Sequence, residues 1–429
     1  MDTAVRTAIE RQNPWWQEKK YPTGIPRLSQ YPDISLYLPL PEILVLQGAR
    51  RSGKSTLVYQ IIDAIIKTNV PAKSILYLNL DEPILNANGT EPGFLMEIIE
   101  QYRVEHGGLR YLCLDEVQHS PHWAATVKIL YDTAPDIKSV ITGSNSLVVE
   151  HEMSLLLSGR YLAVRIYPLN FGEFLTFTGK KNLTTTEKTY LARKFLRYGG
   201  FPRVVLEENE QVKDAILRQY YETIYLKDII SPRLIRSTQD LISLLYICLS
   251  QVGSIISFQR LAGSLNISAD TVKEYIGYAE DAYLLHTIRR FDFSAHQQQS
   301  HGKKIYCADT GLINSVSYAF SDNIGHILEN LVCTTLLSRH SPVWYHKDRY
   351  ECDFIVTNQG KPVQAIQVCS SVKDEATRKR EIRGLIEAIA QYHLSKGIII
   401  TLEEEGREVV GDVLIEFIPL AEWLLTSND

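Results

Sequence analysis

The eight residues from Gly48 to Ser55 combine glycines, a lysine and a hydroxyl group at a spacing suited to phosphate binding. They read GARRSGKS, which fits the pattern G-x-x-x-x-G-K-[ST]. Glycines let backbone N–H groups point at phosphates, and a helix beginning at Ser55 adds its dipole. We expect Lys54 to reach the β- and γ-phosphates and the Ser55 hydroxyl to ligate Mg²⁺. The pattern therefore predicts a site for ATP with Mg²⁺. The residues expected to contact the nucleotide here are Gly48, Ala49, Arg50, Arg51, Ser52, Gly53, Lys54, Ser55 and Thr56.

Two acidic residues, Asp115 and Glu116, end a second apolar run, LRYLCLDE. A carboxylate at the tip of a buried strand beside a phosphate loop can hold magnesium, with Ser55, through its water shell. The next carboxylate can polarise an attacking water. The order Asp115–Glu116 therefore predicts hydrolysis catalysed by Lys54, Asp115 and Glu116, rather than nucleotide binding alone.

Polar residues also end two neighbouring runs. SVITGSNS brings Ser144 and Asn145 to the expected position of the γ-phosphate, where they either sense that phosphate or form an ordinary turn. Asn79 lies on the strand SILYLNL and is a candidate to hold Glu116 in an inactive pose. These residues extend the predicted site to two further strands.

The elements that must position these residues follow an alternating pattern from Glu42 onward. Short apolar runs such as ILVLQG and SILYLNL are separated by helical stretches such as STLVYQIIDAIIK. This alternation predicts an α/β fold with a doubly wound parallel sheet. Residues 184–230 and 238–287 read as helical, and strands return from Lys304 in an α+β pattern. The first 40 residues, rich in proline, read as an arm on which Trp15 and Trp16 pack against the next domain.

Composition limits the class of protein. The chain has 429 residues, enough for two or three domains, and a formal net charge of -5, which excludes a uniformly basic nucleic-acid coat but not a local basic patch. Its 6 cysteines are scattered without zinc-ligand spacing. The N-terminus lacks the apolar core of a signal peptide, and no run reaches the ~20 apolar residues of a membrane span. We therefore expect a cytoplasmic protein that does not enter a membrane.

The motifs together resemble one family. The phosphate loop, LCLDE, TGSNS, LLLSGRYLAVRIYPLNFGEFL and YGGFP are similar to prokaryotic AAA+-type P-loop ATPases with a C-terminal domain of unknown function. YLKDII, KKIYCADTGL, GHILENLV, YECDFIV and AIQVCSS match the same group in order. The resemblance covers about residues 15–425 and implies a homo-oligomer. It also implies that Arg160 acts as a finger on a neighbouring subunit's ATP, although a structural ion pair within its own subunit is an equal alternative.

The segment ISFQRLAGSLNISADTVKEYIGYAEDAYLLHTIRRF has the form of a winged helix. We expect helices over 258–265 and to about Ala282, with YLLHTIRRF as the wing. Such helices often enter a major groove, but this one carries only Lys273 among several acids. DNA binding and a protein-contact role are both open.

The last part resembles the restriction-endonuclease-like core. Active members place Glu on a helix, Asp on a strand and Glu-x-Lys on the next strand; here Glu329 and Asp353 match the first two positions. Gln367 and Cys369 stand at the third site, so we expect a neutral ligand, no cation beside a scissile phosphate and no nuclease activity. A basic run after it either contacts DNA phosphates or forms a solvated face. That run is Arg378, Lys379, Arg380 and Arg383.

These expectations combine into one reading of domains and function. The reading is an ATPase that couples nucleotide state to binding of DNA, plausibly branched or junction DNA. The alternative is an ATP-switched protein-interaction or defence-signalling module. The expected domains are 1–40 as an N-terminal arm, 41–205 as an AAA+-type ATPase domain, 206–298 as a helical linker and winged helix, and 299–429 as an inactive restriction-endonuclease-like domain.

Overall fold

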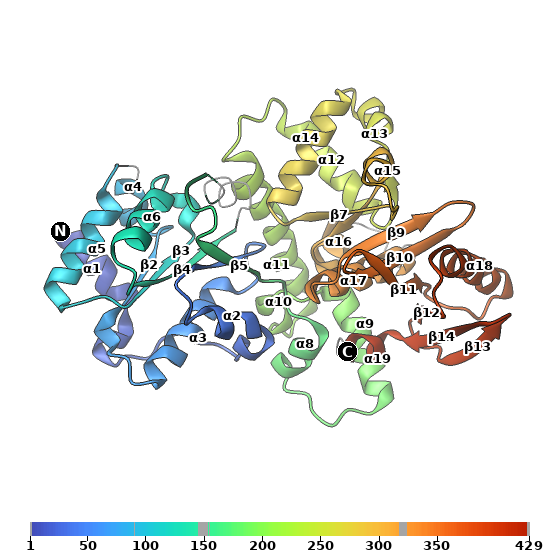
Figure 1. The fold of residues 1–429 in the computed structure, drawn as a ribbon, viewed down its shortest axis with the longest axis horizontal. Helices are drawn as coiled ribbons and strands as arrows, with labels where there is room; N and C mark the ends of the chain where they lie inside the picture. Colours follow the sequence, from blue (N-terminus) through green and yellow to red (C-terminus); the bar gives the residue numbers. More distant parts are fainter. Residues whose placement is uncertain (1, 90, 145–152, 154, 317–323, 427–429) are drawn as a thin grey trace. The chain divides into compact units, whose positions relative to one another are not determined.

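The computed structural model describes residues 2–89, 91–144, 153, 155–316 and 324–426 (Figure 1). The chain forms two compact units, one of Met1–Ile166 with Asp281–Tyr283 and one of Tyr167–Glu280 with Leu284–Asp429. Helices α8 and α9, which follow Ile166, pack against α16, α17 and α19, and α10 packs against α8 and α11, so all three belong to the second unit.

The first unit is built on a five-stranded sheet of order β2-β3-β4-β1-β5. Every pairing in it is parallel, so the carboxyl ends of all five strands lie at one edge. The strands are β1 (Ile43–Gln47), β2 (Ile75–Asn79), β3 (Tyr111–Asp115), β4 (Lys138–Gly143) and β5 (Tyr161–Arg165).

Side chains alternate between the two faces of this sheet, and both faces are buried. Ile43 and Val45 of β1 join a core with helices α1, α5 and α6. Leu44 and Leu46 join the other core, with α3 and with Trp15 of the arm. Burial on both faces explains the continuous apolar runs in the sequence. The helical segments of this unit are α1 (Thr3–Gln12), η1 (Pro14–Gln17), η2 (Leu28–Gln30), α2 (Pro32–Tyr37), α3 (Lys54–Lys67), η3 (Ala72–Ser74), α4 (Pro83–Asn88), α5 (Phe94–His106), η4 (Val117–His119) and α6 (Trp123–Thr133).

The second unit begins with helices and contains two sheets. The helical segments before its first strand are α8 (Phe171–Phe177), α9 (Thr185–Tyr198), α10 (Pro202–Val205), α11 (Glu210–Thr223), the π-helical turn η5 (Ile224–Ile230) and α12 (Thr238–Ser250). A three-stranded antiparallel sheet follows, of order β6-β8-β7. Its strands and helices are β6 (Ile255–Ile256), α13 (Phe258–Leu265), α14 (Ala269–Asp281), β7 (Leu285–Arg289), α15 (Ala295–Ser300) and β8 (Lys303–Cys307).

The larger sheet of the second unit has six strands in the order β13-β14-β12-β11-β10-β9. Strands β9, β10 and β11 form an antiparallel meander, β12 pairs in parallel with β11, and β14 pairs in parallel with β12. Helix α18 buries Leu385 and Ile389 on this sheet. The elements are α16 (Thr310–Val316), α17 (Ile324–Ser338), β9 (Val343–Lys347), β10 (Glu351–Asn358), β11 (Lys361–Val368), α18 (Glu375–Tyr392), β12 (Lys396–Thr401), β13 (Gly406–Val410), β14 (Val413–Pro419) and α19 (Leu420–Leu425).

The expected α/β class with a parallel sheet is confirmed for the first unit. The arm also packs as expected, since Trp15 is 3% exposed and Trp16 stacks on Tyr102 at 5.0 Å between ring centroids. Within the described residues, helices long and apolar enough to cross a bilayer are absent.

Candidate functional site

The phosphate loop connects β1 to α3 at the carboxyl edge of the parallel sheet. Gly48 has φ +153°, and a Cβ there would lie 2.1 Å from the Ile166 carbonyl oxygen, so only glycine fits. Lys54 opens α3 and is 3% exposed. Its Nζ donates to the Gly48 and Ala49 carbonyls at 3.0 and 3.1 Å, so the ammonium is turned back over the loop. That geometry places a buried cation where phosphates would bind.

The arm supports this loop, which the sequence did not indicate. The Arg27 guanidinium donates through Nη1 to the Ser52 carbonyl at 2.6 Å. Gln60 of α3 fixes the arm by accepting from the Arg27 backbone N–H at 2.8 Å and donating to Thr23 and Ile25 carbonyls at 2.7 and 2.9 Å. Arg27 is 2% exposed, so the contact is shielded from water. Arg27 is therefore a positioning residue for the loop.

Asp115 ends β3 and is 1% exposed. Its carboxylate accepts from the Tyr77 hydroxyl at 2.7 Å and from the Thr142 hydroxyl. Burial, with the neighbouring charge of Glu116, raises the pKa of Asp115, while hydrogen bonds from Thr142, Tyr77 and Ser55 oppose the rise. Asp115 and Ser55, the pair expected to hold Mg²⁺, are thus brought within hydrogen-bonding distance of each other. An oxygen-only pair of this kind suits Mg²⁺.

Glu116 follows in the left-handed region, with φ 54°, and its backbone N–H donates to the Thr142 hydroxyl at 3.0 Å. Its carboxylate accepts from Gln118 Nε2 at 2.5 Å and from the Ser144 hydroxyl at 3.1 Å. Burial raises the pKa of Glu116, but the charges of Lys54 and Arg50 outweigh burial and lower it overall. Glu116 is therefore a carboxylate held in a fixed orientation.

The predicted residues at the strand ends fall into different places. Ser144, fully buried after β4, contacts Glu116 and also accepts from Gln118 at 3.0 Å. Asn145 lies outside the described residues. The Asn79 side chain accepts instead from the Asp81 N–H at 2.9 Å, and the hydrogen bonds to the Glu116 carboxylate come from Gln118 and Ser144. Gln118 was missed because its role depends on a turn rather than on a strand end.

Arg160 stands at the opposite edge of the sheet. It precedes β5, whose Tyr161 pairs with Ile43, whereas the loop follows Gln47, which pairs with Arg165. Arg160 pairs with Asp132 at 3.3 Å and lies over the Tyr131 ring. The full length of β5 therefore separates Arg160 from the phosphate loop, so Arg160 does not reach the phosphates of its own subunit. The ion pair within its own subunit, which the sequence left open as an alternative, is present.

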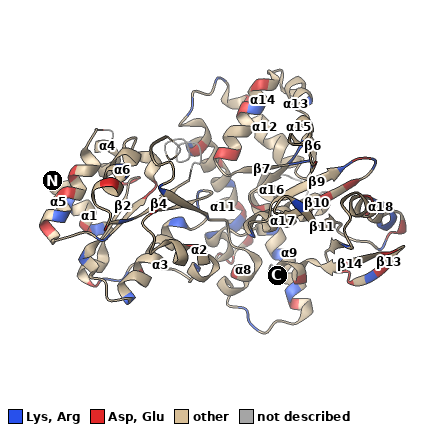
Figure 2. Cartoon of the chain, viewed as in Figure 1, with Lys and Arg blue, Asp and Glu red and all other residues tan. Residues whose placement is uncertain are grey.

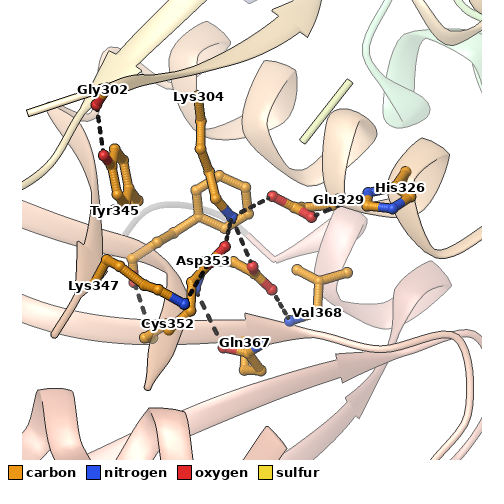
Figure 3. A network of polar contacts seen from close by, with 12 residues as sticks. Gly302, Lys304, His326, Glu329, Tyr345, Lys347, Cys352, Asp353, Gln367 and Val368 are labelled. Atoms are coloured by element: carbon orange, nitrogen blue, oxygen red, sulfur yellow. Dashed lines mark hydrogen bonds and ion pairs between the residues drawn. The ribbon is translucent and has the colours of Figure 1, made fainter. Parts of the chain in front are cut away.

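The second unit contains a buried polar cluster around the predicted nuclease-like positions (Figure 3). Glu329 of α17 and Asp353 of β10 come together through Lys304 of β8, whose Nζ lies 2.9 Å from Glu329 Oε1 and 3.0 Å from Asp353 Oδ1. The absence of a cation beside a scissile phosphate, expected from Cys369, stays a prediction. The cation beside the two acids comes instead from another sheet, far from the strand on which the motif places its lysine.

Gln367 and Cys369 stand where active nucleases carry Glu and Lys, and both side chains are hydrogen-bonded within the chain. Gln367 accepts from the Asp353 N–H at 3.2 Å and donates to Glu381 at 2.6 Å, so both ends of its amide are hydrogen-bonded within the chain. The Cys369 thiol donates to the Ser371 carbonyl at 3.0 Å, and burial raises its pKa to about 11. Burial together with the Asp353 charge raises the pKa of Glu329 to about 7.

The basic candidates for DNA binding lie on α14 and α18, where basic and acidic residues alternate along the helices (Figure 2). Most of them are paired with the chain's own acids. The pairs are Lys273–Asp270 at 3.0 Å, Arg378–Glu408 at 2.6 Å, Lys379–Glu375 at 2.6 Å and Arg380–Glu381 at 2.5 Å. Arg383 is exposed and makes no ion pair with the part of the chain that the structure describes. Apart from Arg383, the positive charges of these candidates on α14 and α18 are therefore offset by neighbouring carboxylates.

Comparison with known families matches three consecutive segments of the chain. A family described as an AAA domain matches residues 40–175. A domain of unknown function (DUF8612) matches 167–323, and another (DUF4143) matches 324–423. The first match covers the loop, Asp115 and Glu116.

The chain is also similar to individual proteins over most of its length. An uncharacterized protein of Methanocaldococcus jannaschii, MJ1544, is 32% identical over 417 residues, covering 92% of this chain and 90% of the relative. An uncharacterized protein of Haemophilus influenzae is 29% identical over 392 residues, covering 89% of this chain and 94% of the relative. Among solved structures, the Walker-type ATPase PABY2304 of Pyrococcus abyssi is 13% identical with a TM-score of 0.46, covering 68% of this chain and 96% of that one. That score is too low to establish a common overall fold.

Proposed function

This chain belongs to the same family as MJ1544 of Methanocaldococcus jannaschii, and we propose that it is a Mg²⁺-dependent ATPase whose nucleotide state controls binding by its C-terminal half. The AAA domain makes the N-terminal part an AAA-type P-loop ATPase.

One observation carries the hydrolytic part of the proposal: Lys54, Asp115 and Glu116 lie at a single edge of the parallel sheet. When ATP binds, the Lys54 ammonium exchanges the two loop carbonyls for phosphate oxygens. Ser55 and Asp115 would hold Mg²⁺, which when bound neutralises phosphate charge. Glu116, kept ionised by the nearby cations, accepts a proton from the attacking water.

Ser144 and Gln118 give the site a means of registering the γ-phosphate. Both donate to the same oxygen of Glu116, and Gln118 also donates to Ser144. A phosphate oxygen that accepts from the Ser144 hydroxyl would compete with Glu116 for that proton. Glu116 would then be released toward the water only when ATP is present.

DNA is the first candidate partner of the C-terminal half. The order α12, β6, α13, α14, β7, β8 with an antiparallel three-stranded sheet supports the winged-helix interpretation. The order α17, β9, β10, β11, α18, β12, in which β12 adds in parallel to the meander, supports the nuclease-like interpretation. Related nuclease cores include junction resolvases, so branched DNA is the form proposed, by analogy of fold.

A protein partner is the second candidate, and the ion pairs favour it. Four of the five basic residues expected to contact phosphates are paired with the chain's own carboxylates. Binding to DNA would have to break these pairs or leave them beside the backbone, which weakens the electrostatic gain that drives such binding.

The experiment compares the purified protein with Lys54→Ala. Wild-type protein should bind and hydrolyse ATP, and Lys54→Ala should lose both. A gel-shift panel of duplex, single-stranded, forked and four-way DNA, each with and without ATP, then separates the partners. ATP-dependent shifts that weaken steeply with salt support DNA, whereas no shift at low salt with ATP present supports the protein partner.

A further inference from the structure

The Lys304 ammonium sits at the point where three carboxylates converge (Figure 3). Its Nζ lies 2.9 Å from Glu329, 3.0 Å from Asp353 and 2.8 Å from Glu351. The three acids come from α17 and β10, and the lysine comes from β8 of the other sheet. Carboxylate oxygens are ligands that divalent metal ions such as Mg²⁺ and Ca²⁺ prefer in proteins. Within the described residues, with the ammonium in place, acids, histidines and cysteines form no group arranged to hold a metal ion.

The donors of this ammonium are used up. A lysine ammonium has three N–H donors, and each of the three carboxylates accepts within 3.0 Å. No donor is left for a phosphate oxygen. This separates Lys304 from a catalytic lysine, which must keep a donor for the substrate or the attacking water.

The ammonium is also closed off from solvent. The Lys304 side chain is 1% exposed, and those of Glu329 and Asp353 are 9% and 8% exposed. The turn after α12 closes over Glu329 so tightly that a Cβ on Gly253 would lie 2.8 Å from its Oε2. Gly253 has φ 77°, a second reason for glycine at this position.

Other contacts fix β8 relative to α17. The Asn330 side chain accepts from the Cys307 N–H at 2.7 Å and donates to the Cys307 carbonyl at 2.9 Å. The Tyr306 hydroxyl donates to Glu329 at 2.8 Å. These contacts hold β8 beside α17, so the backbone of Lys304 is fixed next to the acids that its ammonium contacts.

We propose that this cluster is a cation site whose resident cation is the Lys304 ammonium, which takes the place of a divalent metal ion. The native chain then binds no metal ion at this cluster, because the ammonium occupies the site. Removal of the ammonium leaves three carboxylates that take up an oxygen-preferring divalent cation. The inference does not depend on the proposed ATPase activity.

The test measures Mn²⁺ binding and the melting temperature of the full chain without nucleotide. Any Mn²⁺ bound by Ser55 and Asp115 beside the phosphate loop is then the same in every protein compared. For wild type, chelator should leave the melting temperature unchanged, and Glu329→Gln should remove no Mn²⁺ site. Lys304→Ala should lower the melting temperature by on the order of 10 °C, because buried carboxylates lose their partner. It should also gain one Mn²⁺ site, and Mn²⁺ should restore part of the lost stability.

Lys347 provides a matched control. Its Nζ pairs with Glu351 at 3.2 Å, but its side chain is 44% exposed and stands outside the cluster. Lys347→Ala should gain no Mn²⁺ site, and the site gained by Lys304→Ala should disappear in Lys304→Ala/Glu329→Gln.

Two results would overturn the proposal. One is a Mn²⁺ site in the wild-type protein that Glu329→Gln abolishes, because Lys304 would then stand beside a metal instead of replacing it. The other is a folded Lys304→Ala protein without a new Mn²⁺ site. If Lys304→Ala does not fold in chelator, recovery of folding with Mn²⁺ supports the proposal, and failure to recover contradicts it.

Discussion

Replacing Tyr77 by phenylalanine removes the hydroxyl that donates to the expected magnesium ligand and that is also hydrogen-bonded to Tyr59. The Tyr77 hydroxyl donates to Asp115 Oδ2 at 2.7 Å from the neighbouring strand β2. The ring itself packs against Trp15 and Tyr59, with centroids 6.3 and 5.1 Å away. Phenylalanine keeps those contacts, so the variant isolates the hydroxyl.

The size of the effect follows from the charge on the acceptor. A hydrogen bond to a charged group contributes about 1.5–3 kcal/mol, and about 1.4 kcal/mol corresponds to a factor of ten. Asp115 keeps the donor from Thr142, so we expect the lower end of this range. Without the Tyr77 donor the carboxylate is less well oriented toward Mg²⁺. The Mg²⁺ concentration for half-maximal hydrolysis should rise about tenfold.

The assay is ATP hydrolysis at saturating ATP over a series of Mg²⁺ concentrations. Tyr59→Phe is the matched control, since Tyr59 is hydrogen-bonded to Tyr77 and not to the carboxylate. That variant should shift the Mg²⁺ dependence much less. If Tyr77→Phe and wild type require the same Mg²⁺ concentration, Asp115 does not hold the metal in the way argued above.

Three further predictions concern other parts of the molecule. Burial raises the pKa of Asp309 from 3.8 to about 6, so the folded state favours the protonated carboxyl. The free energy of unfolding should therefore fall by up to about 3 kcal/mol as pH rises from about 4 to about 6. Denaturant unfolding curves measured over a pH series should show this fall, and Asp309→Asn should flatten it. Asn330→Leu leaves the Cys307 N–H and carbonyl without their side-chain partner and should lower the free energy of unfolding by about 2–6 kcal/mol, measured by the same method. If Arg160 acts on a neighbouring subunit, mixing Arg160→Ala with Lys54→Ala subunits should restore part of the hydrolysis; a mixture with no gain over its components would leave Arg160 only the structural pairing with its own subunit.

The parts of the site that depend on local sequence could be predicted. The phosphate loop must be continuous, because its backbone N–H groups act together with Lys54 and Ser55 at the start of one helix. Asp115 and Glu116 were identified because burial on both faces of the sheet makes β3 an unbroken apolar run that ends at them. Geometry of this kind depends only on residues that are neighbours in the sequence, so the sequence alone can predict it.

Contacts between distant residues were not predictable in the same way. Arg27 reaches the loop from the arm, and Lys304 reaches Asp353 across 49 positions of the chain. Neither residue is marked by spacing or by type, since an isolated lysine in an apolar strand reads as a strand end. Only the pairing of the sheets brings these groups to their acids.

Charge patterns on helices were also open to two interpretations for a physical reason. Arg378 and Arg380 look like a basic run, but their partners differ in distance along the chain. Glu381, the partner of Arg380, is the next residue on the same helix, whereas Glu408, the partner of Arg378, lies on strand β13. A helical sequence gives the positions of its own charges and says nothing about acids on the sheet beside it.

The central claim, hydrolysis of ATP with Glu116 as the group that activates water, is tested most directly by measuring ATP binding and hydrolysis together for wild type and Glu116→Gln. Glutamine keeps the size and most hydrogen bonds of the side chain but cannot take a proton. The account predicts that Glu116→Gln binds ATP with Mg²⁺ as tightly as wild type and hydrolyses it at least about a hundredfold more slowly, the scale of general base catalysis. Hydrolysis by Glu116→Gln at the wild-type rate would contradict it.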